Sequence, residues 1–319
     1  MTDDASGSSS PVARGLRWVF LDDARRRLRT GYRLVLHAIG VLLSYLVGAG
    51  LVWAAGGTTV ARANAVALQT MLVVLVTWCA ARWLDRRSPL DLIGRLDRAA
   101  ALELLLGSVL GGGLIVTVAI AEGVTSGATY APVAITTAAV FRALSALLFF
   151  VAVAIDEELW FRAYQLTNLA EGVEGWLGRP RARAAALVIS ALVFGLAHAM
   201  NPNASLLATA NIAVGGLFLG VSYAITGRLY VALGLHFAWN TAQCFLDMPV
   251  SGQTLYDELF VHREETGEDL VTGGAFGPEA GLLGLAAMML GTVLCLIHAR
   301  SRRRTNEKHL AKLDEIAGS

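Results

Sequence analysis

Apolar runs of roughly 16–24 residues recur along this 319-residue chain and constrain its fold more than any other feature. A helix needs about 20 apolar residues to cross a hydrocarbon layer of about 30 Å. The chain is 55% hydrophobic and only 16% charged, which is too apolar for an ordinary water-soluble domain. The sequence therefore predicts an all-α, polytopic membrane protein with about eight transmembrane helices.

The basic residues lie beside alternate connections between these runs and so predict an orientation. They gather before the first run, after the second, between the fourth and fifth, between the sixth and seventh, and after the last. Because Lys and Arg stay on the cytoplasmic side, both termini are predicted to be cytoplasmic. The predicted spans are Leu34–Ala54, Ala65–Trp83, Ala101–Ile120, Ala134–Ala154 with an extension through Leu166, Ala184–Ala199, Leu206–Thr226, Val231–Leu246 and Ala280–His298.

Composition divides the chain into five segments. They are a polar and basic N-terminal tail with a candidate surface helix (1–33), the N-terminal transmembrane helices (34–130), a core that carries the candidate chemistry (131–246), an acidic non-cytoplasmic loop (247–279), and the last helix with a charged tail (280–319). Cys79, Cys244 and Cys295 fall within predicted spans, so neither a disulfide framework nor a zinc knuckle is expected. Nothing in the sequence indicates a nucleic-acid partner.

The stretch "VAVAIDEELWFRAYQL" places Glu157 and Glu158 against a long apolar run. An ionisable group inside a membrane segment costs roughly 2.5–3.5 kcal/mol on insertion scales, so each needs a partner or a role. Glu158 and Arg162 are four residues apart on one helical face and can form an ion pair. Glu157 points about 100° away without such a partner, and an apolar setting would help it accept a proton. The alternative is a helix end with ordinary solvated charges.

Two further clusters lie on other apolar runs. Phe194 and His198 are four residues apart at the end of one run, and the asparagines and proline of "NPN" follow and would stop that helix. His236 and Asn240 are four residues apart in another run and share one helical face. A lone intramembrane histidine is more often a hydrogen-bonded core residue, but a glutamate, two histidines and an asparagine on three helices indicate a site.

The order of these motifs resembles the CPBP family (CAAX protease and bacteriocin-processing, also called Abi) of intramembrane glutamic proteases. The matching residues are Glu157, Glu158 and Arg162 for E-E-x-x-x-R, Phe194 and His198 for F-x-x-x-H, and His236 and Asn240 for H-x-x-x-N. The resemblance covers about 150–245, the catalytic half. Family members commonly carry glycine after the motif arginine, whereas this chain has Ala163, which still permits close helix packing.

The resemblance implies a division of roles among these residues. Glu157 would be the general base, and with His198 it would hold and deprotonate the attacking water. His236 and Asn240 would donate hydrogen bonds to the oxyanion of the tetrahedral intermediate. Glu158 and Arg162 would be a supporting pair.

The protein so implied is an endopeptidase in the cytoplasmic membrane of a bacterium, with a water-filled cavity open to the cytoplasm. Its substrates would be peptides or proteins, including membrane-anchored or lipidated ones. The sequence does not distinguish among these substrates.

Other chemistry and other classes of protein stay open. Glu157, His198 and His236 would also satisfy a catalytic zinc site, although the resemblance favours a metal-free enzyme without a cofactor. No G-x-S-x-G nucleophile elbow supports a serine mechanism. A non-catalytic scaffold, an immunity protein or a transporter could reuse the fold, but no pair of matching broken segments indicates inverted repeats.

Straight helices would not bring these residues together. At 1.5 Å per residue, His198 would lie about 20 Å from the cytoplasmic edge and His236 only about 10 Å from it, with Glu157 shallow. We therefore expect the fourth span to shift toward Leu166 and the fifth helix to be short.

Overall fold

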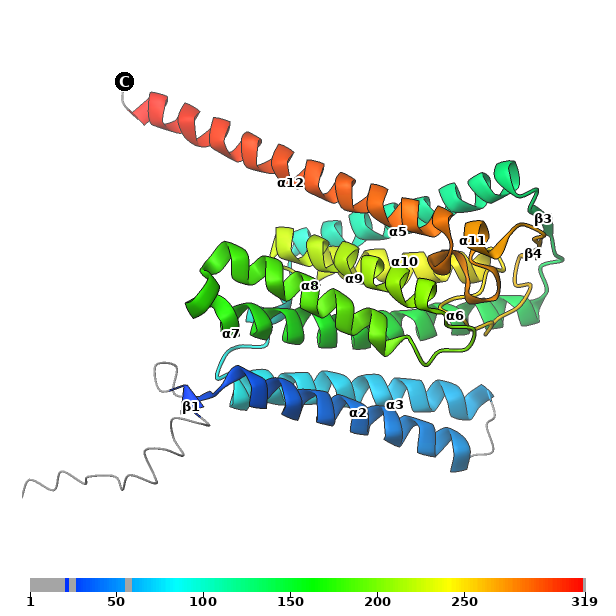
Figure 1. The fold of residues 1–319 in the computed structure, drawn as a ribbon, viewed down its shortest axis with the longest axis horizontal. Helices are drawn as coiled ribbons and strands as arrows, with labels where there is room; N and C mark the ends of the chain where they lie inside the picture. Colours follow the sequence, from blue (N-terminus) through cyan, green and yellow to red (C-terminus); the bar gives the residue numbers. More distant parts are fainter. Residues whose placement is uncertain (1–20, 23–26, 55–58, 318–319) are drawn as a thin grey trace, which may run out of the picture.

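Long helices run side by side through most of the computed structural model (Figure 1), which describes residues 21–22, 27–54 and 59–317, without the side chains of 59–64 and 302–317. The helical elements are α2 Thr30–Ala54, α3 Thr59–Cys79, η1 Ala80–Leu84, α4 Leu90–Ile93, α5 Arg98–Thr125, α6 Thr137–Glu157, η2 Glu158–Leu166, α7 Thr167–Leu177, α8 Arg179–Ala197, α9 Leu206–Thr226, α10 Tyr230–Phe245, α11 Asp269–Thr272, η3 Gly274–Phe276, η4 Pro278–Ala280 and α12 Leu282–Ala317. Two short antiparallel pairs complete the fold, β1 Leu21–Asp22 with β2 Arg27–Leu28, and β3 Thr129–Pro132 with β4 Val261–Glu264.

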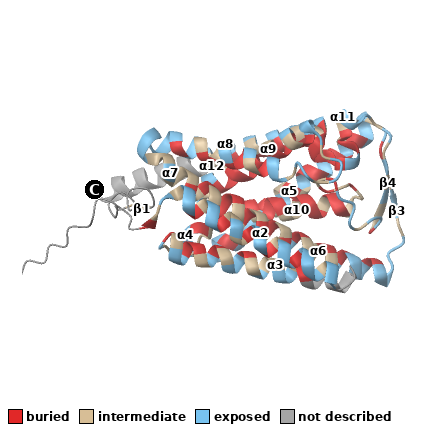
Figure 2. Cartoon of the chain, turned by 60° about the horizontal axis from the view of Figure 1, so that its bottom comes forward, coloured by how far each residue is buried: buried red, intermediate tan, exposed pale blue. Residues whose placement is uncertain are grey.

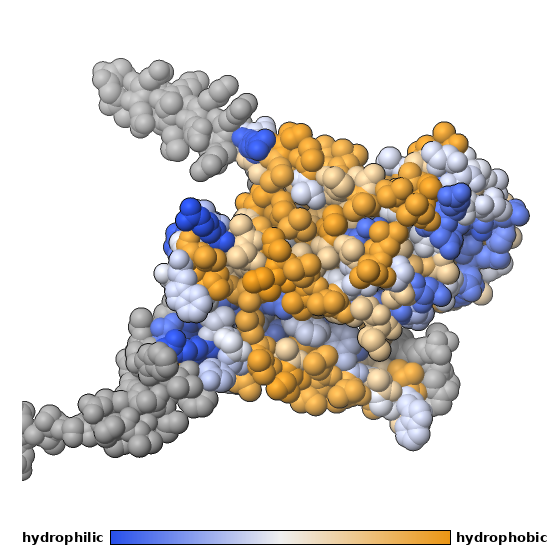
Figure 3. Space-filling model, in the orientation of Figure 1, coloured by the Kyte–Doolittle hydropathy of each residue, from blue (hydrophilic) through white to orange (hydrophobic). Residues whose placement is uncertain are grey.

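Within the described part of the chain, seven helices are long and apolar enough to cross a membrane. The remaining predicted span, Val231–Leu246, corresponds to α10, which has only 16 residues and packs among other helices. The surface agrees with this assignment, because apolar side chains cover the middle of the bundle and hydrophilic ones gather toward its ends (Figure 3). The prediction of an all-α polytopic membrane protein is therefore confirmed.

Several bounds differ from the predicted ones. The fourth span continues through η2 and α7 as one rod, 41 residues long, so Glu157 lies deep within it. The fifth helix ends at Ala197, and α12 runs on to Ala317. The surface helix expected in the N-terminal tail falls largely outside the described residues, and its described part contains β1 and β2. The expectation of a short fifth helix is wrong, because α8 has 19 residues and begins at Arg179, five residues earlier than predicted. The extension of the fourth span and the earlier start of the fifth helix account for the meeting of residues that the predicted bounds would separate.

The segment η2 is π-helical, with backbone hydrogen bonds from i to i+5, a geometry that is often found at functional sites. Backbone carbonyls on and beside it accept bonds from buried side chains. The Ser190 hydroxyl donates to the carbonyl of Phe161 at 2.9 Å, and the Arg162 guanidinium donates to the carbonyl of Gly216 at 3.4 Å. These bonds tie η2 to α8 and α9.

A buried polar network closes the end of the bundle where α2 begins. Arg33 is 1% exposed and donates to the Asp85 carboxylate and to the Asn168 side chain. The Asn168 amide also donates to Asp85 at 2.9 Å, and Arg87 pairs with Glu171 at 2.7 Å. Because buried charges need partners, this network fixes α2 and η1 against α7.

The opposite end carries the β3–β4 pair and the chain that leads from α10 to α12. Glu122, at the end of α5, is fully buried and accepts hydrogen bonds from the Tyr130 hydroxyl at 2.8 Å and from Arg263 at 3.1 Å. Burial and the bond to Glu122 raise the pKa of the Tyr130 hydroxyl. The region predicted as a loop thus contains ordered strands and short helices anchored to α5.

Helices α5 and α10 are in backbone contact, because glycines face one another across their interface. A Cβ on Gly107 would lie 2.3 Å from the carbonyl oxygen of Val231, and one on Gly234 would lie 2.1 Å from that of Leu104. Close approach through small residues is the usual packing mode of membrane helices. Buried residues concentrate along α9 and α10 (Figure 2). This contact sets the position of α10, on which His236 and Asn240 lie.

Replacing Gly234 by alanine should therefore force α10 away from α5. We expect Gly234→Ala to lower the free energy of unfolding by roughly 1–3 kcal/mol, the usual cost of overpacking. The control is Gly113→Ala on α5, where an added Cβ meets nothing within 4 Å. Thermal unfolding of the purified protein in detergent measures both, and equal midpoints for the two variants would contradict the predicted role of this contact.

Candidate active site

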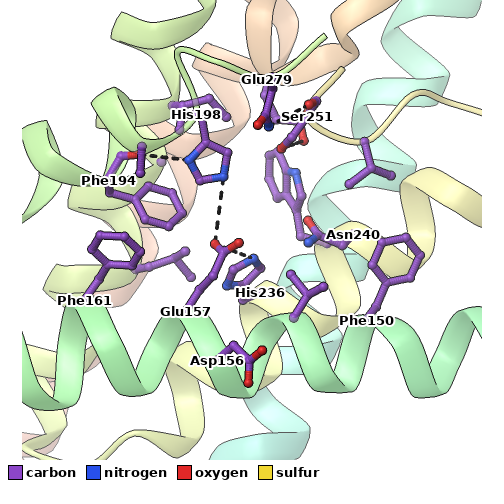
Figure 4. A pocket seen from close by; sticks show the side chains of 18 of the residues that line it. Phe150, Asp156, Glu157, Phe161, Phe194, His198, His236, Asn240, Ser251 and Glu279 are labelled. Atoms are coloured by element: carbon purple, nitrogen blue, oxygen red, sulfur yellow. Dashed lines mark hydrogen bonds and ion pairs between the residues drawn. The ribbon is translucent and has the colours of Figure 1, made fainter. Parts of the chain in front are cut away.

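A cavity of about 820 Å³ lies among α2, α3, α6, α8, α9 and α10, with a wall from the loop after α10 and from η4. Its lining is mostly apolar, with aromatic and aliphatic side chains of all these helices. A small set of polar side chains points into it, as Figure 4 shows: Glu157, His198, His236, Asn240, Ser251 and Glu279, whereas Asp156, also at its border, lies on the other side of α6. A large apolar cavity with a few convergent polar groups is the usual form of a small-molecule or peptide site.

The carboxylate of Glu157 stands between two imidazoles. Its Oε2 lies 3.9 Å from Nε2 of His198 and 3.8 Å from Nε2 of His236. This oxygen is buried and has no hydrogen-bond partner among the described groups. The predicted residues Glu157, His198 and His236 thus come together around one point, from α6, the end of α8 and α10.

The neighbours of the two imidazoles assign their tautomers. Nδ1 of His198 lies 2.8 Å from the carbonyl oxygen of Phe194, which can only accept, so Nδ1 carries the proton. Nδ1 of His236 lies 2.9 Å from Oε1 of Glu158 and donates to that carboxylate. Both Nε2 atoms therefore face Glu157 and the cavity. By fixing which ring nitrogen carries the proton, neighbouring groups determine which nitrogen of a histidine can take part in chemistry.

Glu158 and Arg162 form the ion pair predicted from their spacing. Nη1 of Arg162 lies 2.9 Å from Oε1 of Glu158, and the side chains are 1% and 0% exposed. The guanidinium also lies 4.1 Å from the ring centroid of Phe194, a cation–π distance. The pair thus joins η2 to the end of α8, and Glu158 also orients His236.

Asn240 lies one helical turn beyond His236 on α10 and faces the cavity (Figure 4). It is 7% exposed, as is His236, and the ends of both side chains reach the same cavity as Glu157. All four residues predicted as catalytic therefore line one cavity, as does the motif residue Phe194, with Glu158 and Arg162 packed behind them. Their roles in catalysis stay a proposal.

Two acidic residues of the cavity, Asp156 and Glu279, were absent from the sequence-based site, as were uncharged polar residues such as Gln69 and Ser251. Asp156 is 1% exposed, and its Oδ2 accepts a hydrogen bond from Gln69 on α3 at 3.0 Å. Glu279, from the acidic loop, is 3% exposed and reaches the cavity beside Ser251. The run Asp-Glu-Glu could have indicated Asp156. No local pattern indicates Glu279, because a long connection brings this residue back to the site.

The "NPN" run after His198 holds this long connection over the cavity. The Asn201 amide donates to the carbonyl oxygen of Ser251 at 3.0 Å. At Gly252, where φ is +83°, a Cβ would lie 1.9 Å from the carbonyl oxygen of Pro202, so only glycine fits. The run therefore both ends α8 and anchors the loop that forms one wall of the site.

The exposed members of the lining show where the cavity opens. They are Leu42 on α2, Leu196 near the end of α8, and Leu255 in the loop after α10, with exposures of 52%, 65% and 41%. Toward the other end of the bundle the lining is closed by Phe161 and Leu235, which are 2% and 1% exposed. The exposed rim thus lies on the side of the bundle, at the middle of α2, and beside the loop after α10. The cytoplasmic termini and the opening to the cytoplasm stay predictions.

The three donors of the alternative zinc site have suitable chemistry but wide spacing. Tetrahedral zinc with bonds of about 2.0–2.1 Å would bring its ligand atoms to about 3.3 Å from one another. The carboxylate oxygen of Glu157 lies 3.8 and 3.9 Å from the two nitrogens. No group of three or more His, Cys, Asp or Glu side chains poised to hold a metal ion occurs in the described part of the chain.

Residues 138–242 match the model of the family described as "Type II CAAX prenyl endopeptidase Rce1-like". The match covers all three motifs and less than half of the chain, and it confirms the resemblance predicted from the motifs. It indicates a CAAX-type protease, a peptide hydrolase. No curated protein and no solved structure matches the chain.

The buried ion pair behind the site leads to a stability prediction. Arg162→Met would leave the Glu158 carboxylate buried with His236 as its remaining close donor, which should lower the free energy of unfolding by about 3–5 kcal/mol. Adding Glu158→Gln removes the stranded charge and should restore most of that loss. Chemical unfolding in detergent measures both variants.

The matched control is Arg179→Met, which breaks a pair with Glu174 whose arginine side chain is 73% exposed. An exposed pair contributes at most about 1 kcal/mol, so this variant should stay close to the parent protein. Equal losses for Arg162→Met and Arg179→Met would refute the assignment of Glu158 as a buried charge.

Proposed function

We propose that this protein is an intramembrane endopeptidase that hydrolyses peptide bonds with a water activated by Glu157 and His198. The match to the CAAX endopeptidase family supports the coarser statement that it is a membrane protease acting on peptides within the bilayer. One observation carries the finer proposal: Oε2 of Glu157 is buried without a hydrogen-bond partner and lies 3.9 and 3.8 Å from the Nε2 atoms of His198 and His236.

Hydrogen-bond valence supports a water at this point. With both Nδ1 protons committed, Glu157 Oε2 and the two Nε2 atoms present three lone pairs to one another. A water molecule can donate hydrogen bonds to two of these lone pairs, and one extra proton bound at the third satisfies the remaining acceptor. His236 is the natural holder of that proton, because Glu158 stabilises a positive charge on its ring. The water then donates to Glu157 and His198 and accepts from His236.

The reaction follows from this arrangement. As the water oxygen bonds to the carbonyl carbon of the peptide, its proton passes to Glu157, with His198 holding the second hydrogen. The carbonyl oxygen becomes an oxyanion and accepts hydrogen bonds from Nε2–H of His236 and from the Asn240 amide. The C–N bond breaks as the proton on Glu157 passes to the leaving amine. Each such fixed donor is worth roughly 2.7–4 kcal/mol in comparable acyl-transfer sites.

The active protein would be a multi-pass protein of a bacterial cytoplasmic membrane and would not need a cofactor. Its substrates would be peptides or proteins, membrane-anchored or lipidated ones included, that enter through the mouth between α2, the end of α8 and the loop after α10. A non-catalytic scaffold or transporter would need no such convergence of an unpaired carboxylate and two imidazoles.

Removing the base should abolish cleavage without removing the protein. Glu157→Gln keeps the shape of the side chain but cannot accept the proton, and we expect at least a roughly 100-fold loss of peptide cleavage for it and for His198→Ala. Cleavage of a peptide library by protein purified in detergent, beside the amount of protein in the membrane, measures this.

The control is Glu174→Gln on α7, which removes a carboxylate of an exposed pair far along the same rod. It should cleave like the parent protein. Wild-type rates in Glu157→Gln would disprove the proposed base and favour a non-catalytic protein.

Metal dependence has a separate test. We expect cleavage to survive dialysis against EDTA and 1,10-phenanthroline, because water activation by Glu157 and His198 requires no metal. Activity that is lost with chelator and restored by zinc would overturn the metal-free mechanism and assign Glu157, His198 and His236 as ligands.

A further inference from the structure

Glu279 is a further carboxylate of the catalytic cavity, on the wall opposite Glu157 (Figure 4). It comes from η4, in the turn that leads into α12. The residue is 3% exposed, and its Oε2 is buried with no hydrogen-bond partner among the described groups. A buried carboxylate is costly unless it is paired, so its retention in the cavity requires an explanation.

The protein itself supplies only uncharged neighbours to this carboxylate. The Ser251 hydroxyl donates to Oε1 at 3.5 Å, and the Gln243 amide also hydrogen-bonds to it. Burial is the main cause that raises the pKa of Glu279 to about 7, and a cation beside it would lower that pKa again. The carboxylate is therefore held in place by neutral groups with one oxygen left free.

The backbone near Glu279 is shaped around that free oxygen. At Gly277, where φ is +108°, a Cβ would lie 2.8 Å from Oε2 of Glu279 and 2.2 Å from the carbonyl oxygen of Pro249. A side chain there would cover the oxygen and collide with the loop. The glycine thus leaves space beside the oxygen that any other residue would fill.

Carboxylates outnumber cationic groups around the cavity. The described side chains of its lining include Asp156, Glu157 and Glu279 but no lysine or arginine. Arg162 is 1% exposed and paired with Glu158 behind the wall, and the proton proposed on His236 lies between Glu157 and Glu158. These cations belong to the Glu157–Glu158 side of the cavity, so a cationic group of a substrate would find an unpaired carboxylate at Glu279.

We propose, on the basis of the protease function above, that Glu279 is a specificity-determining residue that binds a cationic group of the peptide substrate. The group is an ammonium or a guanidinium, from a Lys or Arg side chain near the scissile bond or from a free N-terminus. The preferred substrates are then basic peptides cleaved next to a positive charge.

Two randomised peptide libraries test this, one with free N-termini and one N-acetylated. Both are cleaved by the full-length protein in detergent, and the cleavage sites are mapped by mass spectrometry. We expect Lys and Arg to be enriched near the cleaved bond in both libraries if a side chain is bound. Preference for free N-termini would assign the α-ammonium instead.

Charge removal at Glu279 gives the decisive comparison. The comparison uses matched peptides with lysine or norleucine at the enriched position, or with a free or an acetylated N-terminus if the α-ammonium is bound. Glu279→Gln should reduce kcat/KM for the cationic peptide of each pair roughly 10–100-fold, mainly through KM. The uncharged peptide should be cleaved as before. The control is Glu264→Gln, an exposed residue of β4, which removes the same charge from the same side of the protein.

The outcomes separate this inference from the proposed function. Cleavage by the wild-type protein without any preference for cationic peptides, or a preference unchanged in Glu279→Gln, would overturn the inference alone. If the variant does not fold, the preference of the wild-type protein for lysine over norleucine and over glutamate still decides it. No cleavage of either library by the wild-type protein would overturn the proposed protease, and this inference with it.

Discussion

The placement of three consecutive carboxylates in a membrane-spanning helix, with Asp156 and Glu158 buried and Glu157 only 17% exposed, is the constraint on which the site depends. Successive residues of a helix point about 100° apart, so Asp156, Glu157 and Glu158 face different parts of the bundle. Asp156 accepts from Gln69 on α3, Glu157 faces the two imidazoles, and Glu158 accepts from Nδ1 of His236, whose ring thus lies between Glu157 and Glu158. Because every one of these acids needs polar neighbours, the requirement to provide them for all three fixes α3, α8 and α10 around one helix.

The three acids differ in how many hydrogen-bond and ion-pair partners their carboxylates have, and this difference assigns their roles. Glu158 lies 2.9 Å from both Arg162 and His236, so it is a fixed counter-charge. Asp156 has an amide partner and ties the α2–α3 hairpin to the rod. Glu157 alone combines contact with the cavity and an oxygen that faces two nitrogens at wider spacing. In a helix of this kind the least satisfied acid is the one free to exchange protons with a substrate.

Local patterns predicted the parts of the site that lie on single helices. The four-residue spacings gave the Glu158–Arg162 pair and the shared face of His236 and Asn240, because helical geometry fixes such neighbours. The depth of Glu157 depended on the continuation of α6 through a π-helical segment, which periodicity does not reveal. Glu279 lies in the wall because of tertiary contacts that only the folded chain defines, such as the clamp of the "NPN" run on the loop.

The position of the mouth connects the charge pattern of the chain with access to the site. The end of the bundle rich in arginine holds the buried network of Arg33, Asp85 and Asn168, whereas the exposed rim residues Leu42 and Leu255 lie midway along α2 and on the loop after α10. The energetic cost of moving arginines across a bilayer sets topology during insertion, independently of what the site later does. Because α2 is long and apolar enough to cross the membrane, the exposed side of Leu42 faces lipid, so the rim lies partly beside the bilayer. A membrane-anchored substrate would meet this part of the rim without leaving the bilayer, whichever end of the bundle faces the cytoplasm.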